Sequence, residues 1–210
     1  FGYTGRLLYE PMIPLSATMK RVSRPARASS NTKRRNTTHK AGKSGHIRII
    51  GGQWRGRKLP VIDAEGLRPT TDRNKETLFN WLAPHIVGTH CVDLFAGSGG
   101  LGIEALSRGA KHVTFIDAQK AACKQLQKNL DALAVDTQSY TIINDSAKTW
   151  LNNPTQQHIV FIDPPFASDL CDLALAALAS NLVEAEYLYI EQPRTRAVNL
   201  PPTWQWHRQK

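Results

Sequence analysis

A glycine-rich turn directly after an apolar run is the sequence feature that most constrains the fold of this chain. The run ends at Asp93, and Gly97-Ser-Gly-Gly-Leu-Gly102 follows with the spacing G-x-G-x-x-G. Glycines at a strand-to-helix turn permit positive φ and let the backbone approach a ligand closely. The sequence therefore predicts a strand, a ligand-binding turn and a helix in this order.

Strand and helix patterns alternate along the rest of the chain. We expect strands near 90–95, 112–116, 140–143, 158–162 and 187–191, and helices near 100–108, 119–133, 146–152 and 169–181. An earlier helix should begin at Thr71 or Asp72 and end before Pro84. Continuous apolar strands between helices are typical of a parallel sheet covered on both faces. The predicted fold class is α/β, a Rossmann-like and mostly parallel doubly wound sheet with an N-terminal β-hairpin.

Positive charge is concentrated in the first 60 residues. Residues 1–60 hold 14 Lys and Arg and one acid, whereas residues 61–210 hold 13 Lys and Arg and 16 Asp and Glu. Cations that neutralise phosphates release condensed counterions, so this asymmetry favours a polyanionic partner. A solubilising tail is the alternative interpretation.

Three segments differ in composition. Residues 1–45 are rich in Ser, Thr, Asn, Lys and Arg. They bury too little apolar surface to offset the entropy of ordering, so we expect a disordered basic tail. Residues 46–66 predict a β-hairpin, and residues 67–210 predict the α/β domain. Because the chain does not open on Met and Met19 heads the basic stretch, residues 1–18 are expected to lie outside the natural product.

The predicted hairpin carries cations around one aromatic side chain. Residues 46–50 alternate, Gly51 and Gly52 interrupt the run, and the pattern then resumes. Cations interleaved with an aromatic ring suit an RNA backbone and stacked bases. Packing of the tryptophan against the domain is the alternative, and a hairpin has two faces that allow both. The residues expected to contact RNA are Arg48, Trp54, Arg55, Arg57 and Lys58.

The glycine turn alone is compatible with more than one cofactor. Asp117 stands at the end of the second predicted strand, where it can accept hydrogen bonds from ribose hydroxyls, and on this spacing NAD remains a competitor. Asp93 favours S-adenosylmethionine, because a carboxylate there would face the methionine ammonium and would repel a pyrophosphate. The expected cofactor-binding residues are Asp93, Phe95, Gly97, Ser98, Gly99, Gly102, Asp117, Asp145, Arg68 and Thr70. Asn144 and Ser146 compete with Asp145 for contact with the adenine.

The tetrapeptide Asp163-Pro164-Pro165-Phe166 follows the apolar run at residues 159–162. These four residues are the candidate catalytic group for methyl transfer to the exocyclic amine of a nucleobase. The Asp163 carboxylate and the Pro164 carbonyl can each accept one amine hydrogen, the prolines stiffen the turn, and Phe166 can stack on the base. Termination of a strand by Asp-Pro-Pro is the alternative.

Four segments together resemble the RsmD family of bacterial small-subunit ribosomal RNA guanine-N2 methyltransferases. They are residues 49–58, 67–81, 93–102 and 163–166, and the similarity covers about residues 46–210. The resemblance implies the fold of class I S-adenosylmethionine-dependent methyltransferases and methylation of the N2 amine of one guanine in 16S rRNA. It implies Asp163 and Pro164 as the amine acceptors, Phe166 as the stacking aromatic and Asp117 as the ribose acid.

The resemblance also implies a seventh strand that inserts antiparallel beside the fifth. No sequence follows Lys210 to form it. We therefore expect a C-terminally truncated chain whose final antiparallel strand is missing and whose sheet edge is exposed and prone to association.

Other functions remain open at this stage. An adenine-N6 or cytosine-N4 nucleic-acid methyltransferase would use the same tetrapeptide, and a non-catalytic RNA-binding assembly factor could keep the same fold. A dinucleotide-dependent reductase is a more distant alternative. No apolar stretch approaches the length of a membrane span, and the three cysteines and seven histidines form no ligand pattern. We expect a cytoplasmic monomer that binds 16S rRNA or the small subunit and uses neither metal nor membrane.

Overall fold

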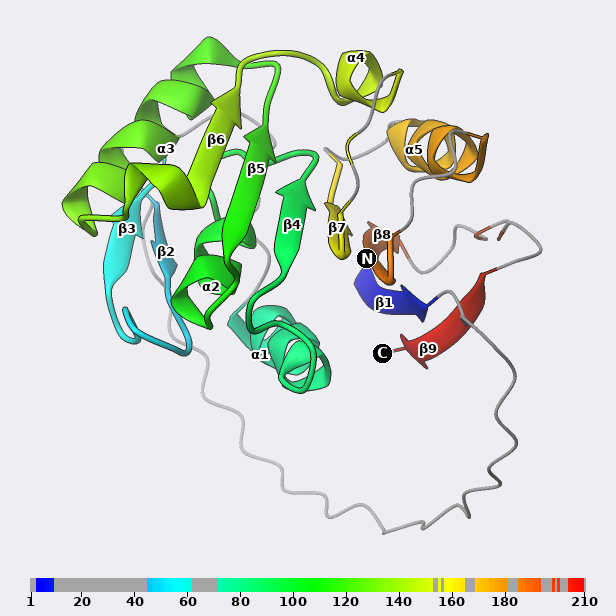
Figure 1. The fold of residues 1–210 in the computed structure, drawn as a ribbon, viewed down its shortest axis with the longest axis horizontal. Coiled ribbons are helices and arrows are strands. Elements are labelled where there is room, and N and C mark those ends of the chain that lie inside the picture. Colours follow the sequence, from blue (N-terminus) through cyan, green and yellow to red (C-terminus); the bar gives the residue numbers. More distant parts are fainter. Residues whose placement is uncertain are drawn as a thin grey trace, which may run out of the picture. The chain divides into compact units, whose positions relative to one another are not determined.

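Apolar runs that alternate with helices give the chain a central sheet. The computed structural model describes residues 3–9, 45–61, 72–152, 155, 157–164, 169–180, 185–193, 198, 200 and 204–209. Seven strands form one sheet in the order β6-β5-β4-β7-β8-β1-β9, and β2 pairs with β3 separately (Figure 1). Within these described ranges, no helix has the length and hydrophobicity that a membrane span requires.

The elements have the following bounds. The strands are β1 Tyr3–Tyr9, β2 His46–Arg48, β3 Lys58–Pro60, β4 His90–Asp93, β5 His112–Ile116, β6 Tyr140–Ile143, β7 Ile159–Ile162, β8 Tyr187–Pro193 and β9 Gln205–Gln209. The helices are α1 Asp72–Leu82, α2 Gly102–Ser107, α3 Lys120–Ala132, α4 Ala147–Leu151 and α5 Leu170–Ser180, with a 3-10 turn η1 at Thr137–Ser139. The predicted alternation of strands and helices is confirmed.

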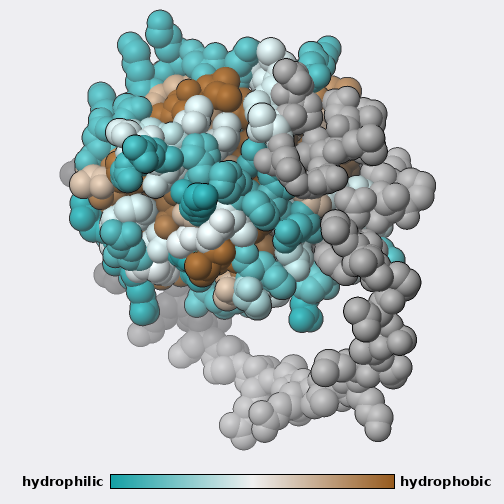
Figure 2. Space-filling view, in the orientation of Figure 1, coloured by the Kyte–Doolittle hydropathy of each residue, from teal (hydrophilic) through white to brown (hydrophobic). Residues whose placement is uncertain are grey.

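Two apolar cores lie on opposite faces of the sheet. One contains residues of α1, α2, α3 and the β2–β3 hairpin, and the other contains residues of α4 and α5. Helix α3 shows how sequence sets the layer, because Ala122, Leu126 and Leu130 recur every four residues and are buried. The predicted doubly wound α/β fold is therefore confirmed. On the face seen in Figure 2, hydrophilic residues cover most of the coloured surface and the hydrophobic areas are small.

The five strands β6, β5, β4, β7 and β8 are parallel. The chain runs outward from β4 to β5 and β6, and then returns to the other side of β4 with β7 and β8. The order reverses between β4 and β7, which is the point where open α/β sheets bind ligands at their carboxyl ends. Asp93 at the end of β4 is in register with Phe161 of β7. The two strands that carry the candidate motifs are thus neighbours, as predicted.

Strand β1 corrects two expectations. The disorder expected for residues 1–45 is wrong for Tyr3–Tyr9, which forms a strand, and residues 10–44 lie outside the described residues. The final antiparallel strand was expected to be missing, with β8 at an open edge. Instead β1 pairs antiparallel with β8 over seven register pairs and with β9 on its other side. The chain before residue 10 supplies the antiparallel strand beside β8.

The predicted N-terminal hairpin is confirmed as the antiparallel pair β2 and β3. Its strands alternate, so that Ile47 and Leu59 are buried in the core while Arg48 and Lys58 are exposed. Arg48 and Lys58 are also direct register partners. Like charges placed opposite each other destabilise a sheet pair, so this register does not add to the stability of the hairpin.

Candidate functional site

The cofactor turn is held by the first carboxylate of the site. Asp93 is buried at the end of β4, and its Oδ2 accepts a hydrogen bond of 3.0 Å from the Gly102 N–H at the start of α2. Its Oδ1 has no hydrogen-bond partner among the described residues. Burial raises the pKa of the Asp93 carboxyl to about 7, the main-chain N–H groups of Gly102 and Phe95 oppose this rise, and the charge of Asp117 adds to it. Asp93 thus accepts a hydrogen bond from the first residue of α2. Its second carboxylate oxygen is buried and has no hydrogen-bond partner among the described residues.

Asp117 contacts the other side of the same turn. It follows β5 and accepts hydrogen bonds of 2.8 Å from the N–H groups of Gly97 and Gln119. Gly97 and Gly99 have φ of +53° and +92°, so the turn adopts the backbone conformation for which glycine is suited. The structure therefore brings Asp93, Asp117 and the glycines together, as the sequence predicted.

The turn after β6 narrows the choice of adenine contact. The Asn144 amide donates to the main-chain carbonyls of Asp117 and Ala118, and the Ser146 hydroxyl accepts the Thr149 N–H at the start of α4. Both side chains have structural roles, whereas Asp145 is exposed and its carboxylate accepts the N–H of the adjacent Ser146. Asp145 stays our prediction for this contact.

The described part of the catalytic tetrapeptide lies at the same edge of the sheet. Asp163 and Pro164 directly follow β7 and are half-buried. Since Phe161 is in register with both Asp93 and Tyr189, residue 163 lies between the ends of β4 and β8. Phe95, predicted to touch the cofactor, is partly buried against the core beside α4 and α5. The other predicted positions Pro165, Phe166, Arg68 and Thr70 lie outside the described residues.

Three residues near Asp163 were missed by the sequence reasoning. The Tyr189 hydroxyl donates to Glu191 Oε2 at 3.0 Å, and the Asn74 amide of α1 donates to Glu191 Oε1 at 3.3 Å. The register Ile162 to Ile190 places Glu191 next to Asp163 on the adjacent strand. Burial, with the charges of Glu191 and Asp163, raises the pKa of the Tyr189 hydroxyl well above its ordinary value, so that it remains a donor. A usable signal existed, because Glu191 comes directly after the apolar run at residues 187–190, just as Asp93, Asp117 and Asp163 come after apolar runs.

The hairpin presents the predicted RNA-binding cations to solvent. Arg48, Arg55, Arg57 and Lys58 are all exposed, and residues 46–60 include no acid. Arg57 also donates to the Ala132 carbonyl at the end of α3, which uses one of its five N–H donors. Trp54 is half-buried and packs in part against the core, so the packing interpretation of this residue is supported.

No group of three or more His, Cys, Asp or Glu side chains suited to a metal ion occurs within the described residues. The three cysteines are buried as free thiols. The described site thus consists of carboxylates, main-chain groups and glycines.

Substitution of two glycines of the cofactor turn by alanine should affect stability differently, because only one of them is closely packed. A Cβ at Gly102 would lie 2.2 Å from the Phe115 ring, whereas a Cβ at Gly100 would meet nothing within 4 Å. We expect Gly102→Ala to destabilise the fold by about 1–3 kcal/mol through overpacking, and Gly100→Ala to leave stability nearly unchanged. Thermal unfolding of both variants measures this, and equal melting temperatures would contradict the close packing of α2 on β5.

Solved structures with related sequences support the methyltransferase class. The Escherichia coli protein described as "Putative methyltransferase yhhF" superposes with a TM-score of 0.71 at 46% identity, covering 78% of this chain and 90% of that one. The fold, together with the carboxylates and the glycine turn at one edge, defines a Rossmann-like S-adenosylmethionine-dependent methyltransferase.

Sequence comparison identifies the family. The family model described as "Conserved hypothetical protein 95" matches residues 47–210. The Ribosomal RNA small subunit methyltransferase D of Escherichia coli is 48% identical over 171 residues, which cover 80% of this chain and 85% of that protein. The protein of the same name from Haemophilus influenzae is 47% identical over 165 residues, 76% of this chain and 86% of its own length. The chain belongs to the RsmD family.

Proposed function

We propose that this protein transfers a methyl group from S-adenosylmethionine to the N2 amine of one guanine in 16S rRNA of the small ribosomal subunit. The coarser activity, methylation of ribosomal RNA, follows from its relatives, which are named small-subunit rRNA methyltransferases. The observation that carries the proposal is the pairing of β4 with β7. It brings the acceptors Asp163 and Pro164 to the same sheet edge as Asp93, Asp117 and the glycine turn.

The residues at this edge suit S-adenosylmethionine. The unpartnered Oδ1 of buried Asp93 is an acceptor for the methionine ammonium, whose charge would stabilise the ionised carboxylate. A Cβ at Gly97 or at Gly100 would meet no atom within 4 Å, so the turn leaves open space for close approach of a ligand. The Asp117 carboxylate, already oriented by two backbone N–H groups, retains lone pairs for ribose hydroxyls. When bound, the cofactor supplies a methyl group on a cationic sulfur.

The chain's own groups make the amine reactive. The lone pair of a base amine is delocalised into the ring, so the nitrogen must become pyramidal before it attacks. The Asp163 carboxylate and the Pro164 carbonyl each accept one amine hydrogen and stabilise the positive charge that develops on nitrogen. A bound cofactor would supply the methyl group together with a neutral thioether as the leaving group, and Asp163 or water would take the proton that the amine loses. Proline fixes φ, so the Pro164 carbonyl is held in place.

The position of Glu191 favours guanine over adenine and cytosine as the base that is methylated. Guanine presents two adjacent donors on its Watson–Crick edge, N1–H and the N2 amine, whereas adenine and cytosine present an acceptor beside their amine. A second carboxylate next to Asp163 matches the guanine pattern and would repel the lone pair of adenine N1 or cytosine N3. The hydrogen bonds from Tyr189 and Asn74 fix the orientation of this carboxylate.

The stability of the protein should depend on pH through the raised pKa of the buried Asp93 carboxyl. The folded-state pKa of Asp93 lies above that of the unfolded chain, so its contribution to stability is present below about pH 4 and is lost as pH rises towards 7. We expect the unfolding free energy of the wild-type protein, relative to Asp93→Asn, to fall across this window and to level off above it. Chemical denaturation between pH 4.5 and 8 without cofactor measures it. A difference that rises with pH would contradict the burial of an unpaired acid.

One labelling experiment tests the proposed function. The protein is incubated with methyl-labelled S-adenosylmethionine and, separately, small subunits from unmodified cells, naked 16S rRNA and duplex DNA. We expect label in the small subunit or its rRNA, recovered as N2-methylguanosine after nucleoside digestion. Recovery of N6-methyladenosine or N4-methylcytidine would favour the other amine methyltransferases. Absence of label on every substrate, with intact cofactor binding, would favour a non-catalytic assembly factor.

A further inference from the structure

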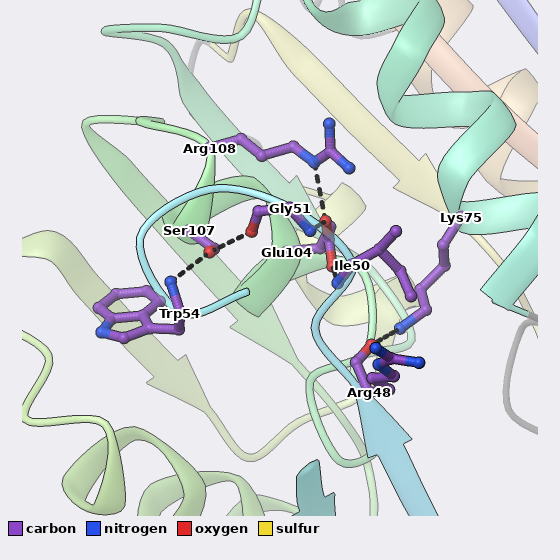
Figure 3. A network of polar contacts seen from close by, with 8 residues as sticks. All are labelled: Arg48, Ile50, Gly51, Trp54, Lys75, Glu104, Ser107 and Arg108. Atoms are coloured by element: carbon purple, nitrogen blue, oxygen red, sulfur yellow. Dashed lines mark hydrogen bonds and ion pairs between the residues drawn. The ribbon is translucent and has the colours of Figure 1, made fainter. Parts of the chain in front are cut away.

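The hairpin is joined to α2 by a buried carboxylate. Glu104 is 1% exposed, and its two oxygens accept hydrogen bonds of 2.8 Å from the main-chain N–H groups of Ile50 and Gly51 (Figure 3). The same carboxylate forms an ion pair with Arg108 at 2.7 Å. A buried charge is costly unless it is paired and hydrogen-bonded, and here the hairpin supplies two of the three donors. Departure of the hairpin would leave Glu104 largely unsatisfied.

Ser107, at the end of α2, forms a second set of hydrogen bonds with the hairpin. Its hydroxyl accepts the Trp54 N–H at 3.0 Å and donates to the Gly51 carbonyl at 2.6 Å (Figure 3). The Ser107 carbonyl also accepts the Gln53 N–H at 2.7 Å. Gly52 fits against this carbonyl, since a Cβ at Gly52 would lie 1.7 Å from the Ser107 oxygen. No side chain therefore fits at position 52, because the Ser107 carbonyl is a main-chain group and cannot rotate away.

The helices that hold the hairpin also hold the cofactor turn. Helix α2 begins at Gly102, whose N–H donates to Asp93, and it holds the hairpin through Glu104 in its middle and Ser107 at its last residue. From α3, the buried Asn129 amide donates both to the Ser98 carbonyl of the cofactor turn and to the Pro60 carbonyl at the end of β3. The hairpin and the cofactor turn are thus fixed to the same rigid elements.

We propose that Glu104 and Ser107 are positioning residues for the RNA substrate: through Ile50, Gly51 and Trp54 they hold the cationic hairpin at one fixed place relative to the cofactor turn. Methyl transfer needs the target amine within a narrow distance of the methyl group, and loss of about 1 Å of positioning can cost about 100-fold in rate. A hairpin that contacts the rRNA backbone can contribute to that alignment only if it is rigid. The inference rests on the proposed function, because it takes the hairpin as an rRNA contact.

Three variants test this clamp between the hairpin and α2. Glu104→Gln replaces one acceptor oxygen by an amide group that cannot accept, and Gly52→Ala forces the hairpin away from Ser107. Gly88→Ala is the matched control, because Gly88 has φ of +77° like Gly52 at +74°, but a Cβ at Gly88 would meet no atom within 4 Å. Each protein is assayed for Kd of S-adenosylmethionine, for KM and kcat on small subunits, and for hydrogen exchange at Ile50 and Gly51.

We expect Glu104→Gln and Gly52→Ala to accelerate exchange at Ile50 and Gly51 and to lower kcat/KM on small subunits by about tenfold or more, with the cofactor Kd within about twofold of wild type. Gly88→Ala should match wild type in kcat/KM. Wild-type kcat/KM in the clamp variants, unchanged exchange at the two amides, or an equal loss in Gly88→Ala would each overturn the inference. Failure of the wild-type protein itself to methylate small subunits would instead refute the proposed function.

Discussion

Replacing Asp163 by Ala should lower kcat for methyl transfer by about 10²- to 10³-fold, the usual cost of removing one group that stabilises developing charge. The Kd of S-adenosylmethionine should stay within about twofold of wild type, because Asp163 is assigned to the amine and not to the cofactor. The loss in kcat is expected because the base amine would lose its charged acceptor and keep only the Pro164 carbonyl. Single-turnover methylation of small subunits, together with equilibrium cofactor binding, measures both quantities.

Two further variants make the Asp163 prediction specific. Asp163→Asn keeps one acceptor oxygen without the charge, so its loss of rate should be smaller than that of Asp163→Ala. Asp172→Asn removes the same charge from an exposed position on α5 and should leave kcat unchanged. A large loss of cofactor affinity in Asp163→Ala, or a full rate in that variant, would contradict the assigned role.

Removal of residues 1–11 should destabilise the sheet strongly. Strand β1 is paired on both sides, so its loss would leave β8 without its antiparallel partner and β9 without the strand that joins it to the sheet. At about 0.5–1.5 kcal/mol for each net backbone hydrogen bond, we expect a loss of about 3 kcal/mol or more. This corresponds to a decrease in Tm of about 6–12 °C for a chain of this length. Thermal unfolding measures the loss, and light scattering should show association through the freed edge.

A rearranged chain provides the matched control for this deletion. The register pairs Arg6 with Gln209, so the middle of β1 lies beside the end of β9 and the two strands run antiparallel. If residues 1–11 are moved to follow Lys210, six residues (210 and then 1–5) connect the paired Gln209 and Arg6, which is within the range of short connections between strands. We expect this variant, which runs from residue 12 to 210 and then from 1 to 11, to recover the Tm of the parent. An unchanged Tm after simple deletion would show that β1 contributes nothing to the sheet.

Local pattern was sufficient to predict the parallel half of the fold. The strands at 112–116 and 140–143 were predicted with the bounds that the structure shows, because parallel strands are short apolar runs that turns interrupt. The site carboxylates Asp93, Asp117 and Asp163 were predictable for the same reason. Each follows such a run, and the carboxyl ends of parallel strands meet at one edge.

Other features depended on contacts that sequence pattern does not encode. Strand β1 was missed because it pairs with β8, about 180 residues away along the chain, and the basic segment that follows it indicated disorder. Glu104 was missed because a glutamate on a helix is usually exposed, and its partners here are backbone N–H groups of a distant turn. Neither Glu191 nor Asn129 belongs to a short motif, although both bind groups of the site. What sequence alone missed was therefore mainly tertiary hydrogen bonding.

The central claim is that one carboxylate and one peptide oxygen hold the base amine against the methyl donor. The most direct measurement is a crystal structure of the protein with S-adenosylhomocysteine and an rRNA fragment that contains the target guanine. We predict that the guanine N2 lies within about 3.2 Å of both an Asp163 carboxylate oxygen and the Pro164 carbonyl oxygen, on the side that faces the cofactor sulfur. A complex in which the Asp163 side chain is directed away from the base, or in which N2 contacts neither oxygen, would contradict the account.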